Sequence, residues 1–329
     1  MEQQAQALKL IEIDRISLLP DCLLIDILSC LPTTKEAIKT CTLSKRWQHL
    51  WPQLPNLIFN NQLFSGLYSL VDKTITQSRQ LNLNRFKLSI VAYDIRFESQ
   101  VNELIHYAIN RNVQQIDVAL LTRTYCVSEH KLDQMLYVNP CLTHLSLRGC
   151  ILNPTCSINW RNLKCLCIAR AKVDEDLIKN ILSGSPVLET LDLRSCYGYK
   201  RLDITSKSVK NLVFAAYGNL YCEHALGSWE LIIKINAPYI LSLTIGGWLM
   251  LSNLLLLNVS TLVKAELNYI KDGNFVEEEE MLKGMILKLR HVNKLKLGNS
   301  CLHVLSRLKA KGFTIPSSMK SPDMTSPLL

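Results

Sequence analysis

The sequence is poor in the residues that mark fibrous, disordered or secreted chains. It has only 12 glycines and 11 prolines among 329 residues, and 20% of its residues are charged while 48% are apolar. This balance excludes a collagen-like or low-complexity chain and predicts a globular protein with a buried core. Gln3, Gln4 and Gln6 stand where a secretory leader would carry basic and then apolar residues, so we expect a cytoplasmic or nuclear protein.

The sequence also lacks the short motifs of common enzymes. No GxGxxG, P-loop, GxSxG or HExxH pattern occurs, and the seven histidines are scattered along the chain. There is no CxxC pair either, and the spacing of Cys141, His144, Cys150 and Cys156 fits none of the usual zinc patterns. We therefore expect no catalytic residue, no cofactor and no metal ion, and we expect the twelve cysteines to be reduced.

One apolar stretch raises the alternative of a membrane segment. Residues 235–263 carry no charge, and Leu249–Leu257 is dense in leucine. A spanning helix needs about 20 predominantly apolar residues, but Pro238, Gly246, Gly247 and several polar residues interrupt this run. The stretch also carries the strand pattern described next, so we favour strands and expect no membrane partner.

A repeat runs through most of the chain. Apolar residues recur at positions 1, 4 and 6 of a short window, and successive windows begin 21 to 31 residues apart. Leu142, Leu145, Leu147, Cys150 and Leu152 fill every position of L-x-x-L-x-L-x-x-N/C-x-L, the pattern typical of leucine-rich repeats. The eight windows are Val113-Ile116-Val118, Leu142-Leu145-Leu147, Leu163-Leu166-Ile168, Leu188-Leu191-Leu193, Val209-Leu212-Phe214, Ile240-Leu243-Ile245, Leu262-Ala265-Leu267 and Val292-Leu295-Leu297.

Amphipathic segments lie between the windows. They predict helices around Val101–Ala108, Leu132–Leu136 and Val173–Leu182, and acidic residues 277–280 open another. Strand and helix alternate at the repeat period, so the predicted fold class is α/β, a leucine-rich-repeat solenoid with a curved parallel sheet and helices outside it. Cys150 and its counterpart Cys196 stand at the N/C position of their repeats, so we expect both to be buried.

In such strands, alternate side chains face the open side of the sheet. Here these positions are polar and varied, which suits recognition of a partner, and the last group is Lys294-Lys296-Gly298. None of them joins a nucleophile to a base. The candidate substrate-binding residues are His144, Ser146, Arg148, Asp192, Arg194, Arg201, Asp203, Lys264 and Glu266.

The first sixty residues differ from the rest. They contain six basic and six acidic residues, so the whole formal charge of +9 belongs to the remainder. Helical spacing predicts one helix that starts at Pro20 and stops at Pro32, a second from Thr33, and a third from Leu43 to Pro52. Three short helices cannot bury so many large apolar groups among themselves. We therefore expect exposed Trp, Leu and Pro side chains beside Arg, as at protein interfaces.

The N-terminal helices follow a specific order of residues. Leu19-Pro20-Asp21-x-Leu23-Leu24-x-x-Ile27-Leu28-Ser29-x-Leu31-Pro32 is followed by Lys35-Glu36-Ala37, Thr40 and Leu43-Ser44-Lys45-Arg46-Trp47-x-x-Leu50-Trp51. This order resembles an F-box of the plant F-box/leucine-rich-repeat family. Together with the repeats, the resemblance implies an F-box domain at residues 14–60, a leucine-rich-repeat domain at residues 61–312 and a flexible C-terminal tail at residues 313–329.

The resemblance also implies a function. In that family the F-box docks on a Skp-type adaptor of a Skp–cullin–F-box ubiquitin ligase, and the repeats hold the protein to be ubiquitinated. Cys22 departs from the family pattern, in which an acidic residue is common there. Many relatives also continue into a further C-terminal domain, where this sequence has a short tail. Carried over by position, the adaptor-binding residues are Leu19, Pro20, Leu24, Ile27, Leu28, Leu31, Leu43, Lys45, Arg46, Trp47, Leu50 and Trp51.

The positive charge supports an alternative function. Nine basic residues and no acidic residue lie between Glu280 and Asp323, and a basic stripe of this kind can follow a phosphate backbone. However, only Phe313 lies nearby as an aromatic residue, and many such residues belong to a solvated face. The alternative is therefore a basic repeat protein that binds nucleic acid without a ligase role, and the sequence favours it less.

Overall fold

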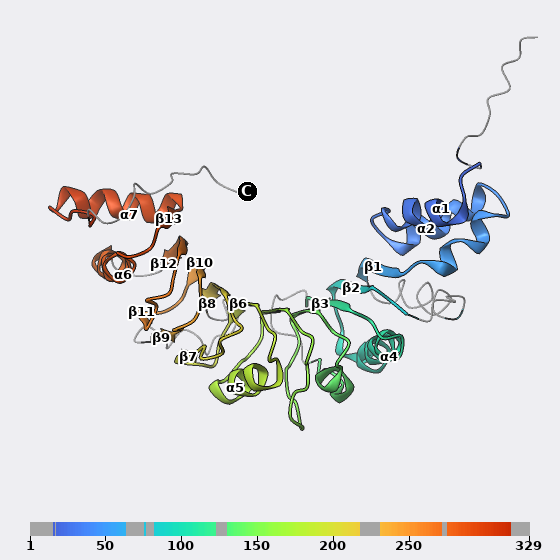
Figure 1. Ribbon diagram of the computed structural model, residues 1–329, viewed down its shortest axis with the longest axis horizontal. Coiled ribbons are helices and arrows are strands. Elements are labelled where there is room, and N and C mark those ends of the chain that lie inside the picture. The colour runs from blue at the N-terminus through green and yellow to red at the C-terminus, as the bar shows by residue number, and fades with distance from the viewer. Residues whose placement is uncertain are drawn as a thin grey trace, which may run out of the picture.

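The chain folds into an arc built on one long parallel sheet. The computed structural model describes residues 16, 18–63, 76, 82–122, 130–217, 231–271 and 275–316. Ten strands lie side by side on the inner side of the arc (Figure 1), which confirms the predicted α/β solenoid with a curved parallel sheet. In order, they are β1 (Asn56–Leu63), β2 (Arg85–Ala92), β3 (Gln115–Leu120), β4 (His144–Arg148), β5 (Cys165–Ala169), β6 (Thr190–Cys196), β8 (Asn211–Tyr217), β10 (Ser242–Leu249), β12 (Lys264–Lys271) and β13 (Lys294–Leu297).

Helices cover parts of the outer side, where amphipathic segments predicted them. They are α4 (Glu98–Ile109), α5 (Glu175–Gly184) and α6 (Phe275–Lys288), and α7 (Asn299–Ala310) lies at the end of the arc next to β13 (Figure 1). The predicted helix around Leu132–Leu136 is only a 3₁₀ turn, Gln134–Val138. In that turn, the carboxylate of Asp133 accepts a hydrogen bond from the N–H of Met135, at 2.8 Å.

A second parallel sheet lies on the outer side between α5 and α6, where only helices were predicted. It contains β7 (Arg201–Asp203), β9 (Ile232–Asn236) and β11 (Asn253–Leu257). Every second residue of β9 and β11 is buried, a period that favours strands over a helix. The uncharged stretch 235–263 is thus shared among strands. No helix within the described ranges is long and apolar enough to cross a bilayer.

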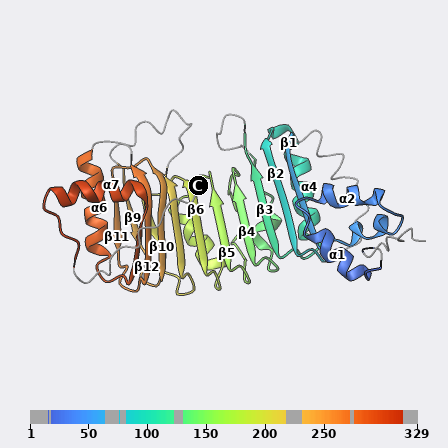
Figure 2. The ribbon, with the colours of Figure 1, turned by 90° about the horizontal axis from the view of Figure 1, so that it is seen from above.

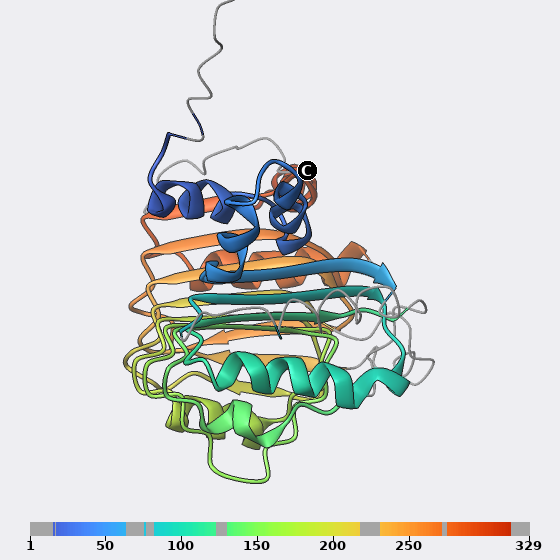
Figure 3. The same cartoon turned by 90° about the vertical axis from the view of Figure 1, so that its right-hand side faces the viewer.

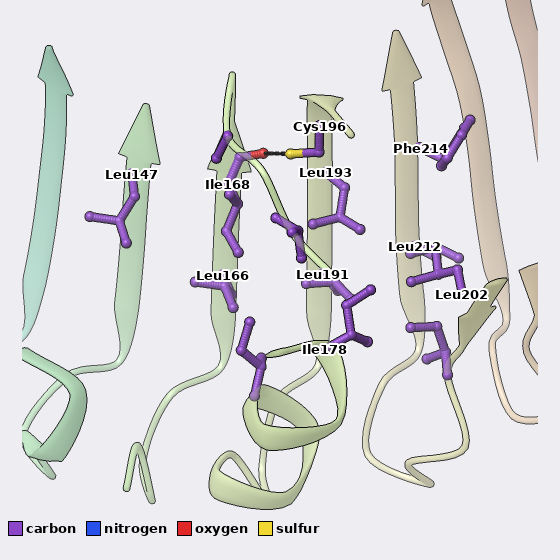
Figure 4. Packing of buried hydrophobic residues seen from close by; sticks show 14 of the residues in the cluster. Leu147, Leu166, Ile168, Ile178, Leu191, Leu193, Cys196, Leu202, Leu212 and Phe214 are labelled. Carbon is purple, nitrogen blue, oxygen red and sulfur yellow. Dashed lines mark hydrogen bonds between the residues drawn. The ribbon is translucent and has the colours of Figure 1, made fainter. Parts of the chain in front are cut away.

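The repeat windows form a continuous core between the inner and outer sides. Leu166, Ile168, Leu191, Leu193 and Phe214 follow one another from strand to strand (Figure 4). All residues of the eight predicted windows are at most 4% exposed, as the repeat predicts. Each strand therefore buries one face against the outer layer and leaves the other face open, because its side chains alternate.

Two repeats precede those found in the sequence. Leu54-Leu57-Phe59 and Leu83-Phe86-Leu88 have the same spacing, and none of these residues is more than 2% exposed. Leu57 and Phe59 lie in β1, Phe86 and Leu88 lie in β2, and Leu57 pairs with Phe86. The sheet thus begins with β1, at Asn56, before the domain boundary expected after residue 60.

The cysteines at the N/C position, Cys150 and Cys196, are buried as predicted. The Sγ of Cys196 donates a hydrogen bond to the carbonyl oxygen of Ile168 at 3.3 Å (Figure 4). Burial raises the pKa of both thiols to about 12, so both are neutral at physiological pH. The ten cysteines in the described ranges are free, and no three His, Cys, Asp or Glu side chains there form a group that could hold a metal.

Candidate functional site

The N-terminal segment forms a small helical body at the β1 end of the arc (Figure 2). Helix α1 (Asp21–Ser29) follows Pro20, and α2 (Thr34–Lys39) follows Thr33. The predicted third helix, Leu43 to Pro52, is wrong, because only 3₁₀ turns occur over Trp47–His49 and Trp51–Gln53. Pro52, at which the predicted helix would end, lies within the second of these turns.

This helical body has a core of its own. Trp47 and Trp51 are each only 5% exposed, and Leu28 is 2% exposed. The prediction that the tryptophans are exposed is therefore wrong, because the 3₁₀ turns place both rings in one apolar cluster with residues of α1. The cluster consists of Leu24, Leu28, Ala37, Trp47, Leu50, Trp51 and Leu54.

Other apolar residues of this segment are exposed. Pro20, Leu23 and Ile27 lie three and four residues apart, so they share one face of α1, which we call the α1 face. Leu23 is 45% exposed and Ile27 44% exposed, and Leu43 in the following segment is 66% exposed. Figure 3 looks onto this end of the arc and shows the helical body (blue) beside β1, ahead of the stacked strands.

The structure divides the twelve predicted adaptor-binding residues by exposure. The prediction omitted Leu23, which is exposed, although its spacing from Ile27 on a helix that is apolar on most sides could have indicated that the two share a face. Pro20, Ile27, Leu43 and Lys45 are exposed, Leu19, Leu31 and Arg46 are half-buried, and Leu24, Leu28, Trp47, Leu50 and Trp51 are buried.

Arg46 is engaged within the helical body itself. Its Nε donates to the carboxylate of Asp21 at 2.8 Å, and its Nη2 donates to the carbonyl oxygen of Leu19 at 2.6 Å. These bonds join the segment after α2 to the first residue of α1 and to Leu19, just before the helix. Arg46 therefore positions the start of the α1 face.

The open face of the ten-stranded sheet holds most of the predicted substrate-binding residues. The strand register aligns Ser146, Asp192 and Glu266 in one row across the sheet, with their side chains half-buried. In neighbouring rows of the same face lie His144, Arg148, Arg194 and Lys264, all exposed. Seven of the nine predicted residues thus share one surface, and their role in binding stays a prediction.

Arg201 and Asp203 lie elsewhere. They belong to β7 of the outer sheet, so the expectation that they share the open face is wrong. The window Tyr199-Leu202-Ile204 has the repeat spacing and is buried, but it packs from the outer side of the core. Arg201 Nε and Asp203 Oδ2 form an ion pair at 2.7 Å on that surface.

The basic C-terminal stretch is partly neutralised. Arg307 Nη2 lies 2.6 Å from Glu278 Oε2, and Lys311 Nζ lies 2.6 Å from Glu279 Oε2. Lys283 Nζ lies 3.8 Å from Glu280 Oε1. Three of the nine basic residues therefore pair with the acidic start of α6, which weakens the nucleic-acid alternative. Lys320 lies outside the described residues.

Comparisons with known proteins agree with this arrangement of helical body and repeats. Residues 75–295 match the family described as the leucine-rich-repeat domain of At1g61320/AtMIF1. The chain is 30% identical to F-box protein At5g03100 of Arabidopsis thaliana, over 92% of this chain and 95% of that protein. It is 33% identical to F-box/LRR-repeat protein 25 of Arabidopsis thaliana, over 60% of this chain and 73% of that protein.

A longer relative shows the same likeness. F-box/LRR-repeat protein At5g02910 of Arabidopsis thaliana is 31% identical over 92% of this chain, and the match covers 64% of that protein. The matches thus include both the N-terminal segment and the repeats. The chain belongs to the plant F-box/leucine-rich-repeat protein family.

Proposed function

We propose that the chain is the substrate-recognition subunit of a Skp–cullin–F-box E3 ubiquitin ligase. Its F-box docks on a Skp-type adaptor, and its repeats hold a target protein. The mechanism is proximity, because a bound target presents its lysines at high effective concentration to the ubiquitin-charged enzyme. In this role the chain is not an enzyme. It works where such ligases work, in the cytoplasm or nucleus.

The observation that carries the proposal is the exposed apolar surface of the F-box. Single exposed apolar residues are common on proteins, but Leu23 and Ile27 are neighbours on the α1 face and follow the exposed Pro20. Adjacent exposed apolar side chains mark interaction sites. A stable and specific interface needs about 800 Å² on each partner, so the α1 face would form the centre of the adaptor contact, with Leu43 and Lys45 beside it.

The separation of the two surfaces also supports the proposal. The α1 face lies on the helical body at the β1 end of the arc, whereas the open face extends along the ten strands (Figure 2). An adaptor on the F-box would leave the open face of β4 to β13 uncovered. The target and the adaptor could then be bound at the same time, which the proximity mechanism needs.

Co-purification with the adaptor tests this proposal. We expect the double substitution Leu19→Ala with Pro20→Ala, and separately Ile27→Asp, to abolish co-purification with a Skp-type adaptor, because both change the α1 face or its edge. The control is Val187→Asp, which changes a residue of the repeats that is 41% exposed and should retain the adaptor. If both F-box variants fold and still bind the adaptor as well as the parent chain, this docking assignment is wrong.

A further inference from the structure

The open face changes in character at its last three strands. The outward positions of the ten strands together carry seven Lys or Arg and three Asp or Glu residues, so the face is positive. Three of these cations gather on β12 and β13, and next to them lies an exposed apolar pair. We call this region the β12 surface, and it consists of Trp248, Lys264, Glu266, Asn268, Ile270, Lys294 and Lys296.

The three lysines of the β12 surface outnumber its one acidic residue, Glu266, which stands opposite Lys296 in the strand register. Lys264 stands directly opposite Lys294 in the strand register, and neighbouring strands are only about 4.8 Å apart. Like charges in such positions destabilise a sheet. Elsewhere on the open face, Lys87 pairs with Asp117 and Arg194 with Asp192. Among the described residues, no acidic group lies in ion-pair contact with Lys264, Lys294 or Lys296, so a partner with carboxylates would relieve their repulsion.

Trp248 and Ile270 form the apolar part of the β12 surface. They are register partners on β10 and β12, and they are 42% and 48% exposed. Gly247, which precedes the tryptophan, has a φ of +69°, and a Cβ there would lie 3.0 Å from the backbone nitrogen of Ala216. This glycine therefore permits the local kink at which the register with β8 shifts. An exposed Trp beside an aliphatic side chain is the composition of an interface anchor.

Asn268 lies between the lysines and the apolar pair. Its side chain covers Gly298, where a Cβ would come within 1.9 Å of the Asn268 Oδ1 atom. The amide is thus confined on the sheet surface, where it can bind the backbone of an extended peptide. Lys264 and Ile270 are about 20 Å apart along β12, since a strand rises about 3.3 Å per residue. That length matches about six residues of an extended chain.

We propose that the β12 surface binds an extended acidic segment of the target protein. Two or more carboxylates of the segment lie over Lys264, Lys294 and Lys296, and an apolar side chain packs on Trp248 and Ile270. The inference rests on the proposed function, in which the repeats hold the target. Glu266 lies within the lysine group and can accept a hydrogen bond from a peptide N–H, a donor that a phosphate backbone lacks, so the surface favours a peptide over nucleic acid.

A peptide selection tests the inference without knowledge of the target. The full chain, bound to its adaptor, is used to select from a phage library of random dodecapeptides. We expect selected peptides to carry at least two Asp or Glu residues and one apolar residue some six positions away. Their affinity should fall by about tenfold or more in Lys264→Glu with Lys294→Glu and in Trp248→Ala. Lys283→Glu on α6 is the matched control and should retain the affinity.

Several outcomes would overturn the inference. One is the recovery of no binder or of peptides without acidic residues, and another is equal affinity in the parent chain and the lysine variant. A random-sequence oligonucleotide that binds the same surface more tightly than the peptides would make it a nucleic-acid site. Adaptor co-purification is measured on the same variants. If the adaptor still co-purifies while peptide binding fails, only the acidic-segment inference is rejected. If the parent chain itself does not co-purify with the adaptor, the ligase role is rejected.

Discussion

At some glycine positions the structure leaves no room for a side chain. Gly149 follows β4 with a φ of +73°, and a Cβ there would lie 2.2 Å from the carbonyl oxygen of Leu120. The carbonyl group belongs to the last residue of β3. We expect Gly149→Ala to lower the free energy of unfolding by about 1–3 kcal/mol, because the left-handed conformation and the contact both oppose a Cβ. Thermal or urea unfolding of the purified chain would measure this.

Gly284 provides the matched control. It lies inside α6, and a Cβ there would meet no atom within 4 Å. Gly284→Ala should therefore raise the free energy of unfolding, by about 1 kcal/mol, because Ala is favoured over Gly within a helix. Opposite signs for the two substitutions are the expected pattern. A loss of stability in both would show that the environment of these glycines differs from the one described.

At the scale of elements, one buried carboxylate joins α6 to α7. The side chain of Glu279 is 7% exposed, and it accepts hydrogen bonds from Lys311 Nζ at 2.6 Å and from Arg307 Nε at 3.2 Å. The hydrogen bond from Lys311, followed by that from Arg307, lowers the pKa of Glu279 below its usual value. A carboxyl with a lowered pKa in the folded state stabilises the fold at neutral pH, and the contribution disappears as the pH falls through that pKa.

We therefore expect Glu279→Gln to lower the melting temperature by a few degrees at pH 7. The difference from the parent chain should shrink as the pH falls below the ordinary glutamate range. Glu280→Gln is the control, because the side chain of Glu280 is 66% exposed and lies 3.8 Å from Lys283. Melting curves at pH 7 and in acid would decide. If Glu280→Gln lowers the melting temperature as much as Glu279→Gln does, the proposed α6–α7 contact is contradicted.

The elements also show what the sequence could predict. Eight of the ten inner strands were predicted, because the 1-4-6 spacing follows directly from one buried face, whereas β1 and β2, which have the same spacing, were missed. The helical segments of α4 and α5 show the 3.6-residue period. The same spacing cannot tell an inner strand from an outer one. Arg201 and Asp203 were therefore assigned to the open face, although β7 lies on the outer side.

In the F-box, composition and order were informative, but burial was not. The composition showed which residues are apolar, and helical periodicity located α1 and α2. It could not show that the 3₁₀ turns Trp47–His49 and Trp51–Gln53 bring Trp47 and Trp51 back to α1. For this reason the buried tryptophans were predicted to be exposed, and Leu23, which is exposed, was missed. Tertiary contacts, which local spacing does not encode, decide which apolar residues form the surface.

At the scale of the whole molecule, the part of the chain that the structure describes has two hydrophobic cores. One contains Leu24, Trp47 and Trp51 of the F-box, and the other runs through all the repeats from Leu57 to Leu308. A hydrogen bond from the N–H of Ile58 to the Oγ1 of Thr34, at 2.8 Å, links α2 to β1. Repeat proteins are stabilised by contacts between neighbouring units, so damage to one core should stay largely within it.

We expect Leu24→Ala to unfold the F-box locally. The side chain is fully buried, and its loss costs about 2–5 kcal/mol, a large part of the stability of so small a core. Hydrogen exchange should then be faster in α1 and α2 but unchanged in β5 and β6. The matched variant Leu191→Ala, which changes a side chain that is 2% exposed in the parent chain, should show the reverse pattern. Faster exchange throughout the chain in both variants would mean that the cores unfold together, and the F-box would then not be an independent docking module.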